Sequence, residues 1–291
     1  MGDTRQLPVP DGLDGMRVDA GLSRLLGLSR TAVVTLTEEG RVAVDGHAAG
    51  KSDRLVAGSW LEVDLPDAER PTTIAAPAEV VAGLTILHED DDIVVVDKPH
   101  FLATMPRGRH VAQTALVRLR QELNLPELSP AHRLDRLTAG VLLFTARREL
   151  RGAYQTLFAQ GLVRKTYLAR AAVDPDLELP SVLRSRIIKR RGHLQAVEEP
   201  GKPNAETLVE HVGGGLYRLI PRTGRTHQLR LHMASIGLPI DNDPLYPNVI
   251  DVAPDDFSQP MQLLAHSLEF GDPVRGHVRE FVSRRTLENS G

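Results

Sequence analysis

The sequence predicts an α+β fold: a large domain with a mixed, mainly antiparallel sheet and flanking helices, preceded by a small α+β domain. Many short strand-like segments follow one another with few helical stretches between them, which disfavours a doubly wound parallel sheet. A stretch rich in Pro, Ala and Thr, residues 66–82, reads as a linker. The 291-residue chain is long enough for both domains.

The small domain is expected over residues 12–65. Apolar residues from Val18 to Leu26 recur at helical spacing. Ser29 can cap a second helix over residues 30–39, and Gly40 suits its C-terminal end. Asp45-Gly46 predicts a tight turn. Strands are expected at residues 41–44 and 60–65.

The large domain is expected over residues 83–291. Alternating or continuous apolar runs indicate its strands, and 3.6-residue periodicity indicates its helices. The expected strands are residues 85–88, 93–97, 141–145, 166–172, 207–212, 217–220 and 263–270, and the expected helices are residues 114–123, 150–160 and 226–236.

Composition excludes several kinds of site. The chain has no cysteine, which rules out disulfides, thiolate metal sites and a cysteine nucleophile. Residues 1–11 lack the basic stretch and apolar core of a signal peptide. No segment approaches the roughly 18 apolar residues of a membrane span. We therefore expect a cytoplasmic protein that does not act in a membrane.

Charge is distributed unevenly along the chain. The net charge is −3, but residues 131–232 hold 18 Lys+Arg and 9 Asp+Glu, so that segment carries +9 and the rest −12. A basic third of a chain is the electrostatic pattern of a nucleic-acid partner. The alternative is an ordinary solvated surface.

The first motif that indicates chemistry is residues 130–140. Asp135 lies between Arg133 and Arg136, directly before an apolar run. Guanidinium groups stabilise the negative charge of a carboxylate, and a charged carboxylate can act as a nucleophile or stabilise a developing cation. Taken alone, the pattern also fits a surface salt-bridge cluster.

Two further motifs follow. In residues 222–232, Thr226 could cap a helix on which His227 and Arg230 share a face, able to bring a guanidinium to a carboxylate elsewhere. His227 and His232 are five apart, which is a poor metal spacing. In residues 164–169, Tyr167 lies on an expected strand and could stack on a base, although a core tyrosine is the commoner case.

The three motifs occur in the order H-R-L-D-R-x-T-x-G, K-x-Y-x-A and R-T-G-R-T-H-Q-L-R. Preceded by D-D-I-V-V-V-D-K-P from Asp91 to Pro99, this order resembles the RluA-type pseudouridine synthases over about two thirds of the chain. The family isomerises uridine to pseudouridine in RNA. The resemblance implies an isomerase that needs no cofactor and no metal.

The resemblance also implies roles for individual residues. Asp135 matches the catalytic aspartate, Tyr167 the tyrosine that packs on the target base and takes part in proton transfer, and Arg230 the arginine that pairs with the aspartate. Arg133 matches an arginine that assists RNA binding, and Leu263 or Leu264 an apolar residue of the uracil pocket. The other basic residues of the motifs are further candidates for RNA contact: His132, Arg136, Arg225 and His227.

The segment from Arg17 to Gly46 resembles the S4 RNA-binding domain, with a helix–turn–helix followed by V-A-V-D-G. This second resemblance implies that basic residues of the small domain meet RNA phosphates. The candidates are Arg24, Arg30 and Arg41; each could equally be an ordinary surface arginine.

Two departures from the family pattern bear on the expectations. Asn242 stands where a Gly is usual, and Asn tolerates a left-handed backbone better than most residues. Residues 100–112 differ from the usual loop, which leaves the RNA target less defined than the chemistry. Ribosomal RNA is the expected substrate, with transfer RNA as the alternative.

Three functions remain open from sequence: an active RNA uridine isomerase, an RNA-binding protein of the same fold that has lost catalysis, and a hydrolase with paired carboxylates. The matching trio Asp135, Tyr167 and Arg230 disfavours the second, and the lack of an evident acidic partner for Asp135 disfavours the third. Whether Asp135 attacks C1′ or C6, or acts as a base on the sugar, stays open.

Overall fold

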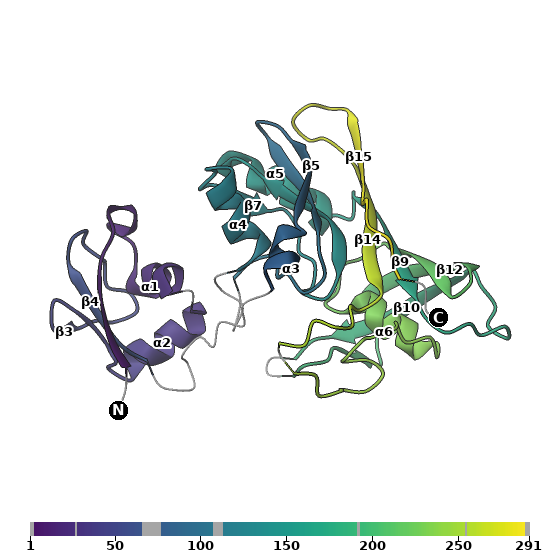
Figure 1. Ribbon diagram of the computed structural model, residues 1–291, viewed down its shortest axis with the longest axis horizontal. Coiled ribbons are helices and arrows are strands. Elements are labelled where there is room, and N and C mark those ends of the chain that lie inside the picture. Colours follow the sequence, from purple (N-terminus) through teal and green to yellow (C-terminus); the bar gives the residue numbers. More distant parts are fainter. Residues whose placement is uncertain are drawn as a thin grey trace. The chain divides into compact units, whose positions relative to one another are not determined.

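The computed structural model describes residues 3–26, 28–65, 77–106, 113–190, 193–253 and 255–288 (Figure 1). The chain divides into two compact units. The N-terminal unit contains residues 1–75 and 105–114, and the large unit contains residues 76–104 and 115–291.

The N-terminal unit combines two helices with a four-stranded antiparallel sheet of order β1-β4-β2-β3. Ser29 caps the second helix as expected, because its hydroxyl accepts the Ala32 N–H at 3.1 Å. Asp45 and Gly46 both have positive φ, at 49° and 77°, and form the predicted turn. The elements are β1 (Asp3–Pro8), α1 (Val18–Leu26), α2 (Arg30–Glu38), β2 (Val42–Val44), β3 (His47–Ala48) and β4 (Trp60–Leu65).

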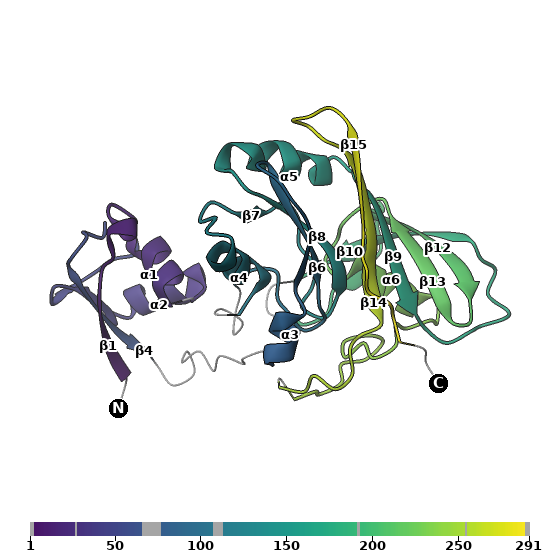
Figure 2. The ribbon, with the colours of Figure 1, turned by 45° about the horizontal axis from the view of Figure 1, so that its top comes forward.

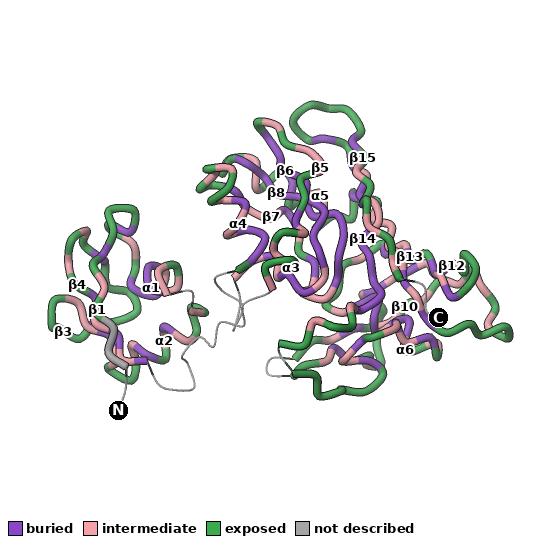
Figure 3. Tube along the Cα trace, in the orientation of Figure 1, coloured by how far each residue is buried: buried purple, intermediate pink, exposed green. Residues whose placement is uncertain are grey.

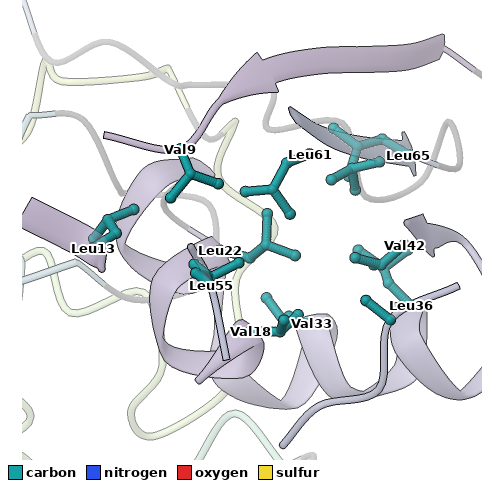
Figure 4. Close-up of a cluster of buried hydrophobic side chains, with 12 residues drawn as sticks. Val9, Leu13, Val18, Leu22, Val33, Leu36, Val42, Leu55, Leu61 and Leu65 are labelled. Atoms are coloured by element: carbon teal, nitrogen blue, oxygen red, sulfur yellow. The ribbon is translucent and has the colours of Figure 1, made fainter. Parts of the chain in front are cut away.

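The core of this unit lies between the helices and the sheet. Apolar side chains from α1, α2 and β4 meet there, among them Leu22, Val33 and Leu61, all fully buried (Figure 4). Strand β1 was not predicted, because D-T-R-Q-L-P lacks the apolar alternation of a half-buried strand; it pairs with β4 at the edge of the sheet.

The large unit is built on one long sheet of order β11-β10-β12-β13-β9-β14-β8-β6-β5 (Figure 2). Its strands include β5 (Thr85–Glu89), β6 (Ile93–Lys98), β8 (Ala139–Thr145), β9 (Arg164–Arg170), β12 (Ala205–Gly213), β13 (Leu216–Pro221) and β14 (Leu263–Gly271). Its helices include α4 (Ala115–Glu122), α5 (Arg151–Ala159) and α6 (Gln228–Ser235). The mixed, mainly antiparallel sheet confirms the predicted fold class.

Other elements of this unit were not predicted. They are α3 (Ala78–Ala82), which falls inside the stretch taken as linker, and β7 (Ser129–Pro130), β10 (Ser181–Ile188), β11 (Val197–Glu199) and β15 (Val278–Val282). The rest of the expected linker, residues 66–76, lies outside the described residues. Residues 107–112, the second part of the divergent loop, lie outside them too.

Strands β6 and β8 form the buried centre of one half of the sheet (Figure 3). Every residue of both strands is buried, which explains their continuous apolar runs. On the other half, Leu229 and Met233 of α6 join a core cluster with residues of β9, β12 and β13. Within the described ranges, no helix has the length and apolar character needed to cross a membrane.

One strand joins the two halves. β14 runs antiparallel to β9 and parallel to β8, with Ala265 opposite both Tyr167 and Gly140. At Gly140, φ is +111°, and an added Cβ would lie 2.2 Å from the carbonyl oxygen of Ala265. Glycine is therefore required for β8 and β14 to approach each other here.

Candidate active site

Asp135 lies in the loop that joins β7 to β8. The Thr138 N–H donates to the Asp135 carbonyl oxygen at 3.0 Å and closes a turn immediately before β8. The side chain of Asp135 is 35% exposed. The backbone of Asp135 is therefore held by this turn, while its carboxylate is accessible.

Side chains of the segment that follows β6 hold the backbone of the Asp135 loop. The hydroxyl of Thr104 donates to the Leu134 carbonyl at 2.8 Å and accepts the Leu134 N–H at 3.2 Å. His100 Nδ1 lies 2.7 Å from the carbonyl oxygen of Leu137. The residues on both sides of Asp135 are thus tied to one neighbouring segment.

Lys98 contributes a third contact to this loop. Its amine is fully buried and donates to the carbonyl oxygens of Pro99 at 3.0 Å, Leu102 at 2.7 Å and Arg136 at 3.4 Å. Burial lowers the pKa of Lys98 to about 7, although the negative charge of Asp135 acts in the opposite direction. A buried amine therefore contacts the backbone of the Asp135 loop at Arg136.

Arg230 reaches the site from the first turn of α6. Its Nη1 lies 3.6 Å from Oδ2 of Asp135, and its side chain is only 3% exposed. Nε and Nη2 donate to the two carboxylate oxygens of Asp243 at 2.7 and 2.5 Å. Burial acts to lower the pKa of Arg230, but Asp243 and Asp135 outweigh it and raise the pKa above its ordinary value.

His227 precedes α6 and also faces Asp135. Its Nε2 lies 3.9 Å from Oδ2 of Asp135, and its Nδ1 lies 3.1 Å from the hydroxyl of Tyr246. The residue has a left-handed backbone with φ +59° and occupies the N-cap position. The expected cap, Thr226, is therefore wrong: the helix begins one residue later, without a side-chain cap.

Tyr167 enters from β9. It pairs with Ala265 of β14, and Ala265 also pairs with Gly140 of β8, so β14 is the one strand between Tyr167 and Gly140. Burial, reinforced by the negative charge of Asp135, raises the pKa of the Tyr167 hydroxyl. The phenol is therefore protonated at neutral pH and is close enough to Asp135 to be affected by its charge.

The site thus joins a carboxylate, a buried guanidinium and a tyrosine from three separate segments. Residues 92–235, which include all three, match the family model described as RNA pseudouridylate synthase. The chain is 38% identical over 293 aligned positions to an uncharacterised RNA pseudouridine synthase of Mycobacterium bovis, covering 96% of this chain and 94% of that protein. The chain belongs to the RNA pseudouridylate synthase family.

A second relative carries a more specific name. The synthase is 32% identical to the ribosomal large subunit pseudouridine synthase D of Nitrosomonas europaea, over 84% of this chain and 72% of that protein. A human structure, RNA pseudouridylate synthase domain containing 1, shares the fold with a TM-score of 0.56 at 23% identity. That alignment covers 70% of this chain and 84% of the human chain.

The apolar candidates of the synthase lie on the strand between the two halves of the sheet. Leu263 is 3% exposed and packs in the same core cluster as Tyr167 and Leu137. Leu264 is 1% exposed and pairs with Ala139 of β8 and Leu168 of β9. Only Leu263 therefore shares a side-chain cluster with the site tyrosine.

The basic candidates near Asp135 differ in exposure. Arg133 and Arg225 are exposed, and Arg225 Nε donates to the Asn204 carbonyl at 3.0 Å. Arg136 is half-buried, with its guanidinium 5.7 Å from the centre of the Phe101 ring. These three remain candidates for RNA contact.

His132 has internal contacts instead. Its ring stacks on Phe158 at 4.4 Å, and its Nε2 accepts the Leu143 N–H at 3.2 Å. Burial lowers the pKa of His132 to about 3, so the ring is neutral at physiological pH. A contact of His132 with RNA stays a prediction, and its described contacts hold β8 to α5.

The candidates of the N-terminal unit all reach its surface. Arg24 and Arg30 are exposed. Arg41 is partly exposed and contacts Glu39 at 3.1 Å and Asp64 at 3.7 Å. Two of the three thus present a guanidinium to solvent, and the third is partly neutralised.

Sequence reasoning missed Lys98, Thr104, Asp243 and Tyr246. Lys98 ends a strand that begins with four apolar residues, and all six residues of that strand are buried. Asp243 has no comparable local signal. Asn242, expected to tolerate a left-handed backbone, has φ +60° and confirms that expectation. Among the described residues, no cluster of His, Asp or Glu has the form of a metal site.

Proposed function

We propose that Asp135 is the catalytic carboxylate with which this RNA pseudouridine synthase isomerises uridine. The supporting observation is the 3.6 Å approach of Arg230 Nη1 to Oδ2 of Asp135, with the arginine buried and the carboxylate 35% exposed. A buried cation beside an accessible carboxylate stabilises its charge while leaving it free to meet a substrate.

The reaction breaks the N1–C1′ bond, turns the uracil and joins C5 to C1′; C5 then loses its proton and N1 gains one, so that the composition is unchanged. No electrons or groups are exchanged with a second molecule, so we propose that the reaction needs no cofactor and no metal. Asp135 attacks C1′ or C6, or removes a proton from the sugar. Tyr167, whose pKa is raised, packs on the base and donates its proton or a hydrogen bond rather than acting as an anion.

The target nucleotide must leave its stack to reach Asp135. We propose that Leu263 or Leu264 lines the uracil pocket and that basic residues around the site hold the RNA backbone. The proposed RNA contacts are His132, Arg133, Arg136, Arg225 and His227. In the N-terminal unit, residues 12–65 act as an S4-like RNA-binding domain through Arg24, Arg30 and Arg41.

We propose ribosomal RNA in the cytoplasm as the substrate, ahead of transfer RNA. The supporting observation is the 32% identity to a protein named ribosomal large subunit pseudouridine synthase D. The target is found by mapping pseudouridine in RNA from cells with and without the gene; sites lost only from transfer RNA would contradict this choice.

The role of Asp135 is tested with Asp135→Asn and Asp135→Ala. Both variants should bind RNA like the parent protein and form no pseudouridine, while Asp176→Asn, an exposed control, should keep full activity. A parent protein that binds RNA but leaves it unmodified would indicate a binding protein. Release of free uracil would indicate a hydrolase. Loss of activity on chelation, with the RNA still folded, would contradict the metal-free mechanism.

A further inference from the structure

The Tyr246 hydroxyl joins three polar groups beside the active site. It accepts the Ala196 N–H at 2.7 Å, lies 3.0 Å from the Ala196 carbonyl oxygen and lies 3.1 Å from Nδ1 of His227. Tyr246 is 4% exposed and Ala196 1% exposed. A buried carbonyl oxygen requires a donor, and the tyrosine is the donor that the structure places on it.

These contacts fix the position of the proton on His227. A phenol carries one hydrogen and accepts two hydrogen bonds. The hydrogen of Tyr246 goes to the Ala196 carbonyl, so Nδ1 of His227 must donate to the phenol oxygen. In the neutral ring, Nε2 is then the acceptor.

Nε2 of His227 points toward the reacting carboxylate. It lies 3.9 Å from Oδ2 of Asp135, too far for a direct hydrogen bond, and both atoms are acceptors. Burial lowers the pKa of His227, and Arg230 and Lys189 act in the same direction, whereas Asp135 and Asp243 oppose them. A neutral imidazole thus presents an unshared acceptor beside Asp135.

We propose that Nε2 of His227 accepts a hydrogen bond from the ribose 2′-hydroxyl of the target uridine. The inference rests on the proposed role of Asp135, in the form in which the carboxylate acts at C1′ or on the sugar and not at C6. The 2′-oxygen is two bonds from C1′, whereas the only N–H of uracil, at N3, is three bonds away. The 2′-hydroxyl is therefore the donor of the nucleotide nearest the reacting carbon, and it distinguishes RNA from DNA.

The variant that isolates this contact is His227→Asn. The asparagine amide can replace Nδ1 as donor to Tyr246, while nothing replaces Nε2. Asparagine also tolerates the left-handed backbone of residue 227, at φ +59°. His277→Gln, at an exposed histidine, is the matched control.

The test compares two RNA oligonucleotides that span the mapped target uridine, one with uridine and one with 2′-deoxyuridine at that position. For each enzyme, kcat/KM on the first is divided by kcat/KM on the second. This ratio should be about tenfold larger for the parent protein and for His277→Gln than for His227→Asn, as expected for one lost hydrogen bond. Equal ratios for the three proteins would overturn the proposal.

A second measurement needs neither RNA nor turnover. Nitrogen-15 NMR of the parent protein, with the ring of His227 assigned through its own backbone resonances, should show protonation at Nδ1. Protonation at Nε2 would overturn the proposal even if the variant failed to fold. Activity retained in Asp135→Asn would instead refute the proposed role of Asp135. The ratio of the two kcat/KM values and the protonated nitrogen of His227 would still decide the proposal on His227.

Discussion

Asp243 holds the guanidinium of Arg230 through both carboxylate oxygens, at 2.7 and 2.5 Å, and leaves Nη1 to approach Asp135. The side chain of Asp243 is completely buried. One of its oxygens also accepts the backbone N–H groups of Leu245 and Tyr246, at 2.8 and 3.2 Å. The orientation of the Arg230 guanidinium is therefore set by a carboxylate that is itself completely buried.

Asp243→Asn should lower kcat at least about tenfold with little change in KM, because Arg230 loses the counter-charge that orients it. The variant should also lose roughly 3–5 kcal/mol of stability, since a buried cation loses one partner. Single-turnover kinetics and urea unfolding measure the two effects, with Asp255→Asn, at an exposed aspartate, as control. An unchanged kcat would remove Asp243 from the positioning of Arg230.

Gly140→Ala should destabilise the large unit by roughly 3 kcal/mol or more, because the new Cβ would meet the Ala265 carbonyl at 2.2 Å on a backbone with φ +111°. Gly271→Ala is the control, since its Cβ would have no atom within 4 Å. Urea unfolding compares them. Similar stability of the two variants would show that β8 and β14 can separate at no cost.

Thr104→Val should cost about 1–3 kcal/mol of stability and reduce turnover, because the buried N–H and carbonyl of Leu134 lose their partner. Thr104→Ser keeps the hydroxyl and should restore most of both. Failure of serine to rescue turnover would mean that the methyl group, and not the hydroxyl, supports the Asp135 loop.

His132→Gln should change how stability depends on pH. The pKa of His132 is about 3 in the folded protein and about 6.5 in the unfolded chain, so the unfolded chain binds the extra proton between these values. The stability of the parent protein should therefore rise with pH from 3 to 6.5, by up to about 1.4 kcal/mol per pH unit more than that of the variant. Urea unfolding at a series of pH values measures the slopes; equal slopes would contradict a neutral buried ring.

Much of the fold could be read from the sequence because its signals are local. Val18–Leu26 and the Asp45-Gly46 turn follow short-range rules, and both are present. Strand β10 was missed because its residues alternate between partly buried and exposed, without a strong apolar face. Thr226 was a reasonable cap by residue type, but the left-handed backbone of His227 starts the helix after it.

Residues of the candidate site could be predicted where they belong to a sequence motif. Residues that contact them from other parts of the chain could not. Asp135 and Arg230 approach each other as the motifs implied. Asp243 was missed because no pattern in the sequence around it indicates that its carboxylate contacts Arg230 of α6. Lys98 was missed because a lysine is ordinarily exposed, whereas this one satisfies three carbonyl oxygens in the interior.

Strand β14 determines when, during synthesis, the two halves of the large sheet can be joined. It joins β9, which carries Tyr167, to β8, which follows Asp135, and at Leu263–Gly271 it comes after both of them in the sequence. During synthesis, the two halves of the sheet are made first and remain unjoined until this strand leaves the ribosome. The nascent chain therefore cannot hold Tyr167 and Asp135 in their final relation before the residues of β14 have been synthesised.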